Sequence, residues 1–322
     1  MPARISTSSV TPLGSLAQFK NYDSTPVIGT VFPDKGTQLS KILEAPNADE
    51  LRRDLAALAS HHGVVVFKDQ DIATEQQKKL VQRMGELTGK PTTTKLHKLP
   101  NMKGDPEAWR EVTIISSGTR VIGCRPVRFE WITDDPKRCT WVSGYEAYGR
   151  LSPSFQKLLE GLTAIHVIRG TVLAQLYDMF GVDPSQELGA PENIGDEMTA
   201  CIVMSSPVVR TSPVTGFKSL FANKTFTKRI NELSPDESDY ILEDLWRHFA
   251  ENYDLQVRHR WELNDVVIWD NRVAVHSATN DYTGHREGKR VLSLGEKPYF
   301  DPESRSRSEA LSYGAGKSSA KL

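Results

Sequence analysis

Four segments of the chain space their apolar residues three or four positions apart, as one face of an α-helix requires. The first begins with Asn47 and Glu50 in the spacing of a capping box and ends before Gly63. The last begins with Ser234-Pro235, a capping serine followed by proline at the first helical position. We therefore expect helices over residues 47–62, 74–84, 152–162 and 234–252.

Short runs rich in β-branched and aromatic residues predict strands, most of them in the last third of the chain. The run 64–67 has the length of a buried strand, and a turn at 213–216 joins 208–210 to 219–222 in a predicted hairpin. Further strands are expected at 112–115, 256–261, 265–269, 273–276 and 290–294. Because helices come early and strands cluster late, we expect a mainly β fold with flanking helices (α+β), an antiparallel barrel or jelly roll.

The length of 322 residues and the composition narrow the class of protein. A formal net charge of −1 provides no basic field for nucleic acid. No apolar run approaches the roughly 18–20 residues that cross a bilayer, and three cysteines leave no paired disulfide framework. A soluble, cytoplasmic protein fits best. The final Ala320-Lys321-Leu322 resembles a peroxisomal address and adds the peroxisome as an alternative compartment.

Composition also divides the chain. Residues 1–45 are expected to form a disordered or extended arm, 46–305 a single domain, and 306–322 a flexible Gly/Ser-rich tail. Residues 181–197, rich in Gly, Pro and acids, are expected to be an exposed insertion. A homo-oligomeric assembly is left open by the sequence.

One polar cluster combines groups that can carry chemistry. His276 ends a predicted strand, and Arg286 and Arg290 follow 10 and 14 residues later, level with that strand if the chain turns back antiparallel. An imidazole is a good iron ligand, and a guanidinium holds a carboxylate with two hydrogen bonds. On the pattern alone the more ordinary interpretation is a hydrogen-bonded structural histidine and two surface arginines.

A family resemblance strengthens the chemical interpretation. Five segments resemble the taurine/alkylsulfonate dioxygenase (TauD/TfdA) family, particularly its fungal members, and they occur in the family's order between about residues 50 and 305. The segments are Gly144-Tyr-Glu-Ala-Tyr-Gly-Arg-Leu-Ser-Pro153, Pro207-Val-Val-Arg-Thr-Ser-Pro-Val-Thr-Gly216, Trp269-Asp-Asn-Arg272, His276-Ser-Ala278 and Gly295-Glu-Lys-Pro-Tyr-Phe300. The resemblance implies a double-stranded β-helix that uses Fe(II), 2-oxoglutarate and dioxygen to oxidise a small organic substrate, sulfonate-like or a fungal metabolite, with release of succinate and CO2.

The resemblance also implies roles for single residues. His276 matches the distal histidine of the family's two-histidine, one-carboxylate iron site. Arg286 and Arg290 match the arginines that hold the far carboxylate of 2-oxoglutarate and, in some members, an anion of the substrate. Thr140 is expected to supply a hydroxyl to 2-oxoglutarate, although an ungapped alignment puts Cys139 at that position.

The first half of the family's iron site departs from the pattern. Where the family has Trp-His-x-Asp, this chain reads Trp131-Ile132-Thr133-Asp134, so Asp134 can bind iron and Ile132 cannot. Only residues 135–138 separate this motif from Cys139, whereas the family has a longer stretch with a Pro-rich strand. We therefore expect one core strand to be absent or replaced by residues 112–131.

Three explanations compete for this departure. The site recruits another ligand, such as His97 or His166; the chain is a pseudoenzyme or non-catalytic partner subunit that keeps the fold; or a segment was lost from the sequence by an incorrect exon boundary. The leading hypothesis is an Fe(II)/2-oxoglutarate-dependent dioxygenase, and the alternative is the impaired relative.

Overall fold

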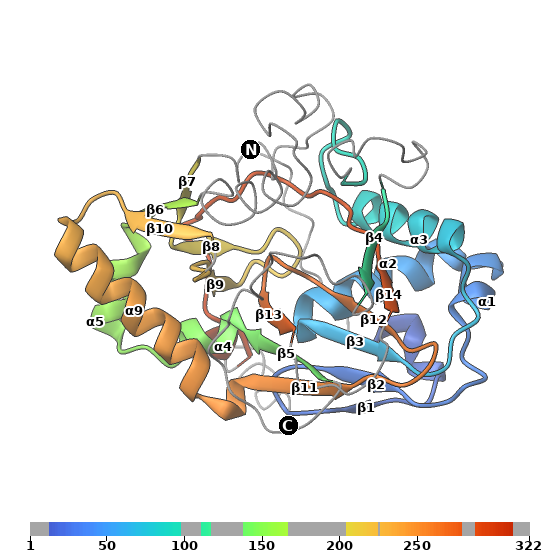
Figure 1. Ribbon diagram of the computed structural model, residues 1–322. Coiled ribbons are helices and arrows are strands. Elements are labelled where there is room, and N and C mark those ends of the chain that lie inside the picture. The colour runs from blue at the N-terminus through green and yellow to red at the C-terminus, as the bar shows by residue number, and fades with distance from the viewer. Residues whose placement is uncertain are drawn as a thin grey trace, which may run out of the picture.

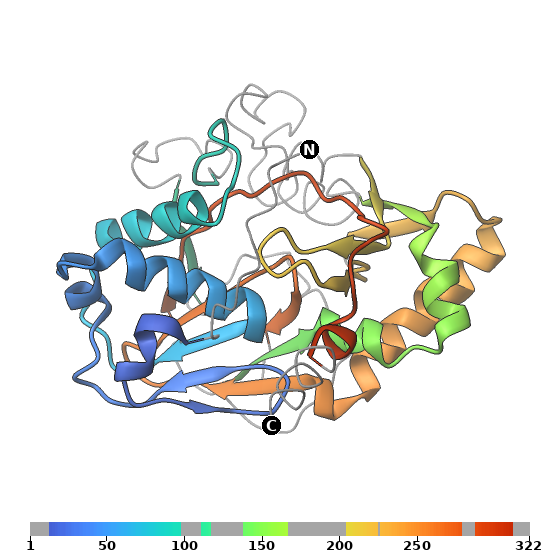
Figure 2. The same ribbon diagram turned by 180° about the vertical axis from the view of Figure 1, so that it is seen from behind.

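Two layers of β-sheet lie between helices in the described part of the protein (Figure 1). The structure, a computed structural model, describes residues 13–97, 111–116, 138–166, 204–224, 226–278 and 287–311. Seen from both sides, helices α2 (Ala48–His62) and α3 (Thr74–Leu87) cover one flank, while α5 (Pro153–Glu160) and α9 (Pro235–Glu251) cover the other (Figures 1 and 2). None of the described helices is long and apolar enough to cross a membrane.

The first sheet has the strand order β1-β2-β3-β12. Its strands are Tyr22–Asp23, Thr30–Phe32, Val64–Phe67 and Val266–Trp269; β2 and β3 run parallel and the other pairs antiparallel. Side chains alternate along β3, so Val65 and Phe67 pack against α2 and α3, while Val64 and Val66 point into the space between the sheets.

The second sheet has the order β11-β5-β13 and is antiparallel throughout. Its strands are Gln256–Arg260, Arg138–Ser143 and Ala274–Ala278. Trp141 on β5 joins Val64 and Val66 in the cluster between the sheets, and the next residue, Val142, joins the cluster under α9. Consecutive residues of β5 therefore face opposite sides of this sheet, one toward the first sheet and one toward α9.

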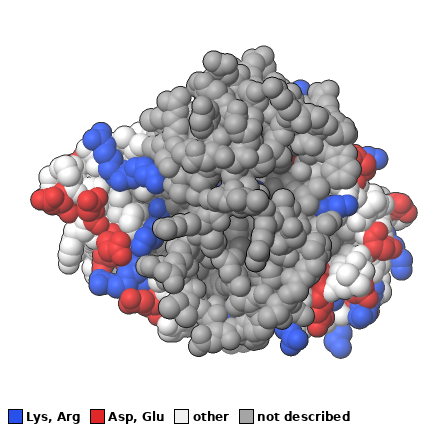
Figure 3. All heavy atoms as spheres, in the orientation of Figure 1, with Lys and Arg blue, Asp and Glu red and all other residues white. Residues whose placement is uncertain are grey.

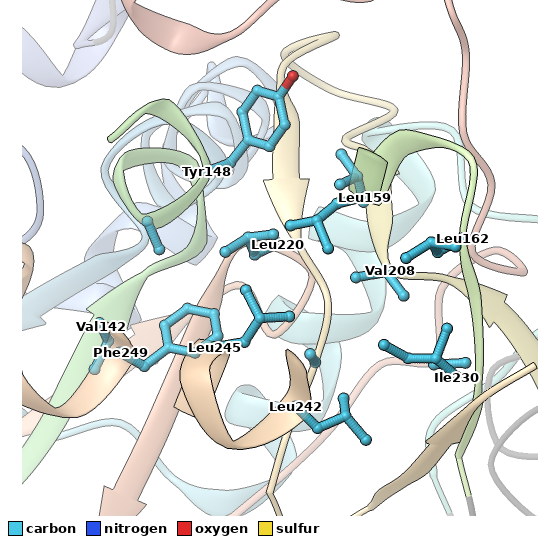
Figure 4. Close-up of a cluster of buried hydrophobic side chains, with 14 of the residues drawn as sticks. Val142, Tyr148, Leu159, Leu162, Val208, Leu220, Ile230, Leu242, Leu245 and Phe249 are labelled. Atoms are coloured by element: carbon cyan, nitrogen blue, oxygen red, sulfur yellow. The ribbon is translucent and has the colours of Figure 1, made fainter. Parts of the chain in front are cut away.

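The outer cluster is built by α9 against the neighbouring helices and strands. Leu242, Leu245 and Phe249 of α9 point toward Leu159 of α5 and Leu220 of β9 (Lys218–Leu220) (Figure 4). All five side chains are at most 2% exposed, which at about 1.5–3 kcal/mol per buried large apolar side chain makes this cluster a main source of stability.

The remaining elements complete the chain order. They are η1 (Gly14–Gln18), α1 (Leu39–Glu44), β4 (Thr113–Ser116), α4 (Gly144–Gly149), β6 (Thr163–His166), β7 (Met204–Pro207), β8 (Val209–Thr211), β9 (Lys218–Leu220), β10 (Thr227–Ile230), η5 (Tyr253–Leu255) and β14 (Glu287–Arg290). They form a β10-β6-β7 sheet, the β8–β9 hairpin and the β4–β14 pair.

Most local signals in the sequence are confirmed. Ser234 and Glu237 form the capping box of α9, Ser152 caps α5, and Gly63 ends α2 with a φ of 76° that a side chain would strain. Asn47 behaves differently: its amide donates to the Glu50 carboxylate at 3.1 Å and leaves the backbone of α2 uncapped.

The expected N-terminal arm is wrong for residues 13–45. Leu16, Phe32 and Leu39 are fully buried, and β2 pairs with the buried β3 over three residues. Glycines and prolines interrupt the apolar pattern of this segment, so its strand is specified by a partner 35 residues away and not by local periodicity.

Two expectations near the C-terminus also need correction. A strand was expected at 290–294, but β14 ends at Arg290. Residues 292–294 instead bond to residues 95–97: His97 N–H donates to Leu292 O, and Leu294 N–H donates to Lys95 O. Residues 306–311, expected in the flexible tail, are described, and Arg307 donates to Glu146 of α4 at 2.8 Å. The insertion at 181–197 lies outside the described residues.

The fold class of sheets with flanking helices is confirmed in these residues, whereas a continuous double-stranded β-helix stays a prediction. Among the described strands β13 has one paired neighbour, β5, and β14 pairs only with β4.

Truncation of Phe32 tests whether residues 13–45 belong to the fold. The Phe32 ring stacks on Phe67 with centroids 4.6 Å apart, and it is fully buried. We expect Phe32→Ala to lower the free energy of unfolding by about 3–5 kcal/mol in urea titrations. Tyr22→Ala, at a side chain 54% exposed in the same segment, should change it by no more than about 0.5 kcal/mol. Equal effects would contradict this assignment.

Candidate active site

His276 lies on the inward face of β13. It stands directly opposite Trp141 of β5, and its ring centroid is 5.1 Å from that of Trp269. Burial, and secondarily the charge of Arg290, lower the pKa of His276 to about 4. At neutral pH the imidazole is therefore uncharged, which is the form that binds a metal ion.

Arg290 ends β14 and lies close enough to His276 and to His97 to lower the pKa of both. Its Nε is buried without a hydrogen-bond partner, and no acidic side chain of the described residues forms an ion pair with it. Burial lowers the pKa of this guanidinium. A buried cation without a counter-charge is costly, so the position is suited to an anion from outside the chain.

The expected pairing of this strand is not found. β14 pairs with β4, with Arg290 opposite Thr113, and among the described strands it is not a neighbour of β13. Arg290 therefore lies near His276 although the two residues belong to different strand pairs. Arg286, Asp134 and Ile132 lie outside the described residues.

The strand register places Thr140 and His276 on opposite faces of the second sheet. Trp141 is opposite His276 and shares its face, so Thr140, opposite Ser277, points to the other face. Cys139, opposite Ala278, is on the His276 face and belongs to the cluster between the sheets. The ungapped alternative at Cys139 therefore agrees with the strand register, and Thr140 does not.

The two alternative ligands lie in different places. His97 is a neighbour of Arg290 and bonds through its backbone to Leu292. His166 lies in the β10-β6-β7 sheet, where its Nδ1 is 3.2 Å from the Thr227 hydroxyl and its ring packs on Phe221. Within the described ranges no three His, Cys, Asp or Glu side chains converge as a metal site.

Comparison with known proteins identifies the family of this chain. The family described as "Taurine catabolism dioxygenase TauD, TfdA family" matches residues 139–292. The α-ketoglutarate-dependent dioxygenase btcD of Neocamarosporium betae is 40% identical, with 93% of this chain and 97% of that protein aligned. The chain belongs to the TauD/TfdA family. It is an α-ketoglutarate-dependent dioxygenase, which consumes dioxygen and oxidises a small molecule.

Other relatives of this dioxygenase agree. The α-ketoglutarate-dependent dioxygenase oryG of Aspergillus oryzae is 37% identical over 94% of this chain and 95% of its own. A putative taurine dioxygenase structure from Burkholderia xenovorans shares the fold, with a TM-score of 0.63 at 22% identity over 88% of this chain and 92% of that one. The relatives do not favour the pseudoenzyme alternative.

The alignments also bear on the departure before Cys139. They extend over 342 positions with btcD and 334 with oryG, more than the 322 residues of this chain. Each relative therefore has residues without a counterpart here. The family match begins at Cys139, directly after the segment in which the iron-binding motif is altered.

A chain of buried charges that the sequence did not reveal holds the turn before His276 in this dioxygenase. Arg272 donates from Nε and Nη2 to the Asp270 carboxylate at 2.8 and 2.7 Å and from Nη1 to Glu296 at 3.2 Å. Glu296 in turn accepts from Arg210, which is fully buried. The Trp269-Asp-Asn-Arg motif and Glu296 both lie in segments that carry the family resemblance. That resemblance is the only feature of the sequence that pointed to these residues.

Asp270 is the carboxylate that Arg272 contacts with two hydrogen bonds. Burial acts to raise its pKa, but the charge and hydrogen bonds of Arg272, with a bond from Ser60, outweigh burial and lower the pKa to about 2. Asp270 therefore stays ionised at neutral pH and keeps Arg272 neutralised.

Asp270→Asn tests the contribution of this network to stability. Removing one partner of a buried ion pair leaves the other uncompensated, so we expect a loss of about 3–5 kcal/mol in the free energy of unfolding. In the unmodified protein the contribution is present above the unfolded pKa of 3.8 and is lost as the pH falls toward about 2. Urea titrations from pH 7 to pH 2 measure both effects.

Asp49→Asn is the matched control. Hydrogen bonds from Arg83 and Arg52 also lower the pKa of Asp49 to about 2, but this carboxylate is exposed. Because water screens exposed pairs, we expect a far smaller loss of stability. If both variants lose the same stability, burial of Asp270 is not what gives the network its importance.

Proposed function

We propose that this dioxygenase binds Fe(II) through His276 and Asp134 and uses Arg290 to bind an anionic group of 2-oxoglutarate or of the substrate. The observation that carries this proposal is the Arg290 guanidinium, which is largely buried and has no acidic partner within the described ranges, beside a neutral His276. An alkylsulfonate or a carboxylated fungal metabolite fits as substrate. Relatives named for sulfonate oxidation, such as the putative enzyme of Schizosaccharomyces pombe at 31% identity, support this class.

The residues present fit a metal in part. His276 offers a neutral ring nitrogen on the inward face, and Asp134 is the carboxylate of the altered motif. A bound Fe(II) with 2-oxoglutarate would supply the activation of dioxygen, with succinate and CO2 as products. Ile132 has no donor atom, so a third protein ligand must come from elsewhere or be missing. Of the two alternatives His97 is the better placed, because His166 packs in a different sheet.

The protein residues bind, orient and exclude water. Arg290 can offer two parallel N–H groups to a carboxylate or sulfonate, and Arg286 is the second arginine proposed for the other anion. Cys139 occupies the place on the His276 face where the family has a hydroxyl, and a thiol is a weak donor. We therefore infer that the arginines contribute more to 2-oxoglutarate affinity than this position does.

The proposed compartment rests on the last three residues alone. Ala320-Lys321-Leu322 would direct the enzyme to the peroxisome, and without recognition of that signal the enzyme would remain in the cytoplasm.

Arg290→Gln tests the anion site. We expect 2-oxoglutarate, or an anionic substrate, to bind more weakly by about 2–5 kcal/mol, because a desolvated ion pair loses one partner. Anaerobic calorimetry with N-oxalylglycine, a non-reactive analogue, measures the co-substrate affinity. Arg260→Gln, at an exposed position on β11, is the matched control and should leave the affinity unchanged. Unaltered affinity for co-substrate and anionic substrates alike in Arg290→Gln would refute the assignment.

Ile132→His tests the metal site. The unmodified protein is expected to bind Fe(II) weakly, since each missing ligand removes bond energy and geometric definition. Restoring the histidine should tighten Fe(II) binding at least about tenfold, because even a residue that only hydrogen-bonds to a metal ligand contributes that much to metal affinity. Anaerobic Fe(II) titration with 2-oxoglutarate, followed by the absorption band of the chelate and then by succinate release in air, measures this. A tight, stoichiometric chelate in the unmodified protein would instead require a third ligand among its own residues.

A further inference from the structure

Two buried polar side chains with unpaired nitrogen atoms lie against the ring of Phe221. The guanidinium carbon of Arg210 is 4.8 Å from the centroid of this ring, and the ring centroid of His166 is 4.9 Å from it. Arg210 is fully buried and His166 is 5% exposed, whereas Phe221 is partly exposed. We call Arg210, His166 and Phe221 the donor cluster.

The donor cluster lies apart from the proposed metal and anion sites. Arg210 is on β8, Phe221 directly follows β9, and His166 ends β6. In both views these strands lie toward the α9 flank, whereas β14, which carries Arg290, lies toward the α3 flank (Figures 1 and 2). A ligand of the cluster therefore does not depend on the residues proposed above to bind iron or 2-oxoglutarate.

Arg210 has donors that its ion pair does not use. Its Nη2 donates to Glu296 at 2.8 Å, while Nε and Nη1 are buried without a partner among the described residues. Because the guanidinium is planar and rigid, holding Nη2 at Glu296 also fixes the directions of the remaining N–H groups. Each buried donor left unpaired costs about 1–3 kcal/mol, so an acceptor from outside the chain would relieve this cost.

The unpaired nitrogen of His166 is also a donor. The hydroxyl of Thr227, a residue 1% exposed, accepts from Asn223 N–H at 2.8 Å and lies 3.2 Å from His166 Nδ1. That hydroxyl has no other acceptor in the described ranges, so it donates to Nδ1. Burial, and secondarily the charge of Arg210, lower the pKa of His166 to about 4. The neutral ring therefore carries its one hydrogen on Nε2, which is buried without a described partner.

The charges around the cluster are already balanced. Glu296 pairs with both Arg210 and Arg272, and Arg272 also pairs with Asp270, so two guanidinium groups face two carboxylates. A bound anion would add an uncompensated negative charge to this buried region, which is costly. An alcohol or amine would bring a further donor. A carbonyl oxygen accepts two hydrogen bonds and brings neither a charge nor a donor.

We propose that the donor cluster binds an uncharged carbonyl compound, such as a ketone or an ester. Its carbonyl oxygens accept from Arg210 and His166, and its carbon framework packs on Phe221. The partly exposed Phe221 ring is the side of the cluster that a ligand reaches from solvent.

Acetophenone is a suitable probe, because it combines one carbonyl oxygen with an aromatic ring and has no donor. We expect it to shift the Arg210 Nε–H signal saturably in NMR titrations of the full-length protein without metal or 2-oxoglutarate. Benzoate is of similar size but carries a negative charge, and it should bind at least about tenfold more weakly. Tighter binding of benzoate than of acetophenone at this signal would overturn the assignment to an uncharged ligand.

Substitutions of the two donors locate the binding. His166→Leu removes the Nε2 donor and should weaken acetophenone binding at least about tenfold, as loss of one buried hydrogen bond implies. His166→Gln keeps an N–H donor and should retain most of the affinity. Arg210→Lys keeps the positive charge opposite Glu296 but not the planar donors, so it should weaken binding as well. Arg229→Lys, at an exposed arginine of β10, is the matched control and should leave the affinity unchanged.

Unfolding midpoints verify that the variants are folded, and calorimetry measures acetophenone affinity in each of them. The two His166 variants decide the outcome even if Arg210→Lys does not fold. Equal affinity in His166→Leu and His166→Gln, or no saturable binding to the unmodified protein, would overturn the site. Neither result would affect the proposed roles of His276 and Arg290, which are tested with Fe(II) and N-oxalylglycine.

Discussion

The turn at Asp270 fixes the relation between the two sheets, and the position of the active site depends on it. Its N–H donates to Gly63 O at the start of β3, and its carbonyl accepts from Val273 and Ala274 at the start of β13. Its carboxylate meanwhile binds Arg272 and Ser60. One residue thus ties the end of β12, the end of α2 and the start of β13 together, and His276 follows six residues later.

Compensation of charge distinguishes the arginines of the Asp270 network from Arg290, the arginine of the proposed anion site. Arg272 and Arg210 are both buried, and both have carboxylate partners in Asp270 and Glu296. Arg290 is also buried but has no carboxylate partner in the described ranges. Burying a charge without a partner is costly, and an anion bound at the proposed site would offset this cost. This contrast supports the anion site more strongly than the presence of an arginine does.

The sequence predicted what local chemistry determines and missed what distant partners determine. The capping box at Ser234, the proline after Ser152 and the apolar run at 64–67 each specify an element by themselves, and each was confirmed. β2 takes its conformation from β3, whose paired residues lie 35 positions further along the chain, so its own residues gave no signal. The choice between Thr140 and Cys139 depends on a third factor: side chains alternate along a strand, so a difference of one residue in the alignment moves the predicted group to the opposite face.

The contacts that position His276 explain how the fold can persist while the iron-binding motif is altered. His276 is held on the inward face by five residue pairs between β13 and β5 and by the Asp270 turn, and none of these contacts involves a metal. On the proposed metal site, the absence of a ligand at position 132 would weaken metal binding without removing what positions His276. The proposed anion site at Arg290 differs, because its guanidinium has no carboxylate partner in the described ranges and an anion would offset the cost of its burial. If both proposals hold, the charge balance of the protein favours retention of the anion, whereas retention of the metal depends only on its ligands.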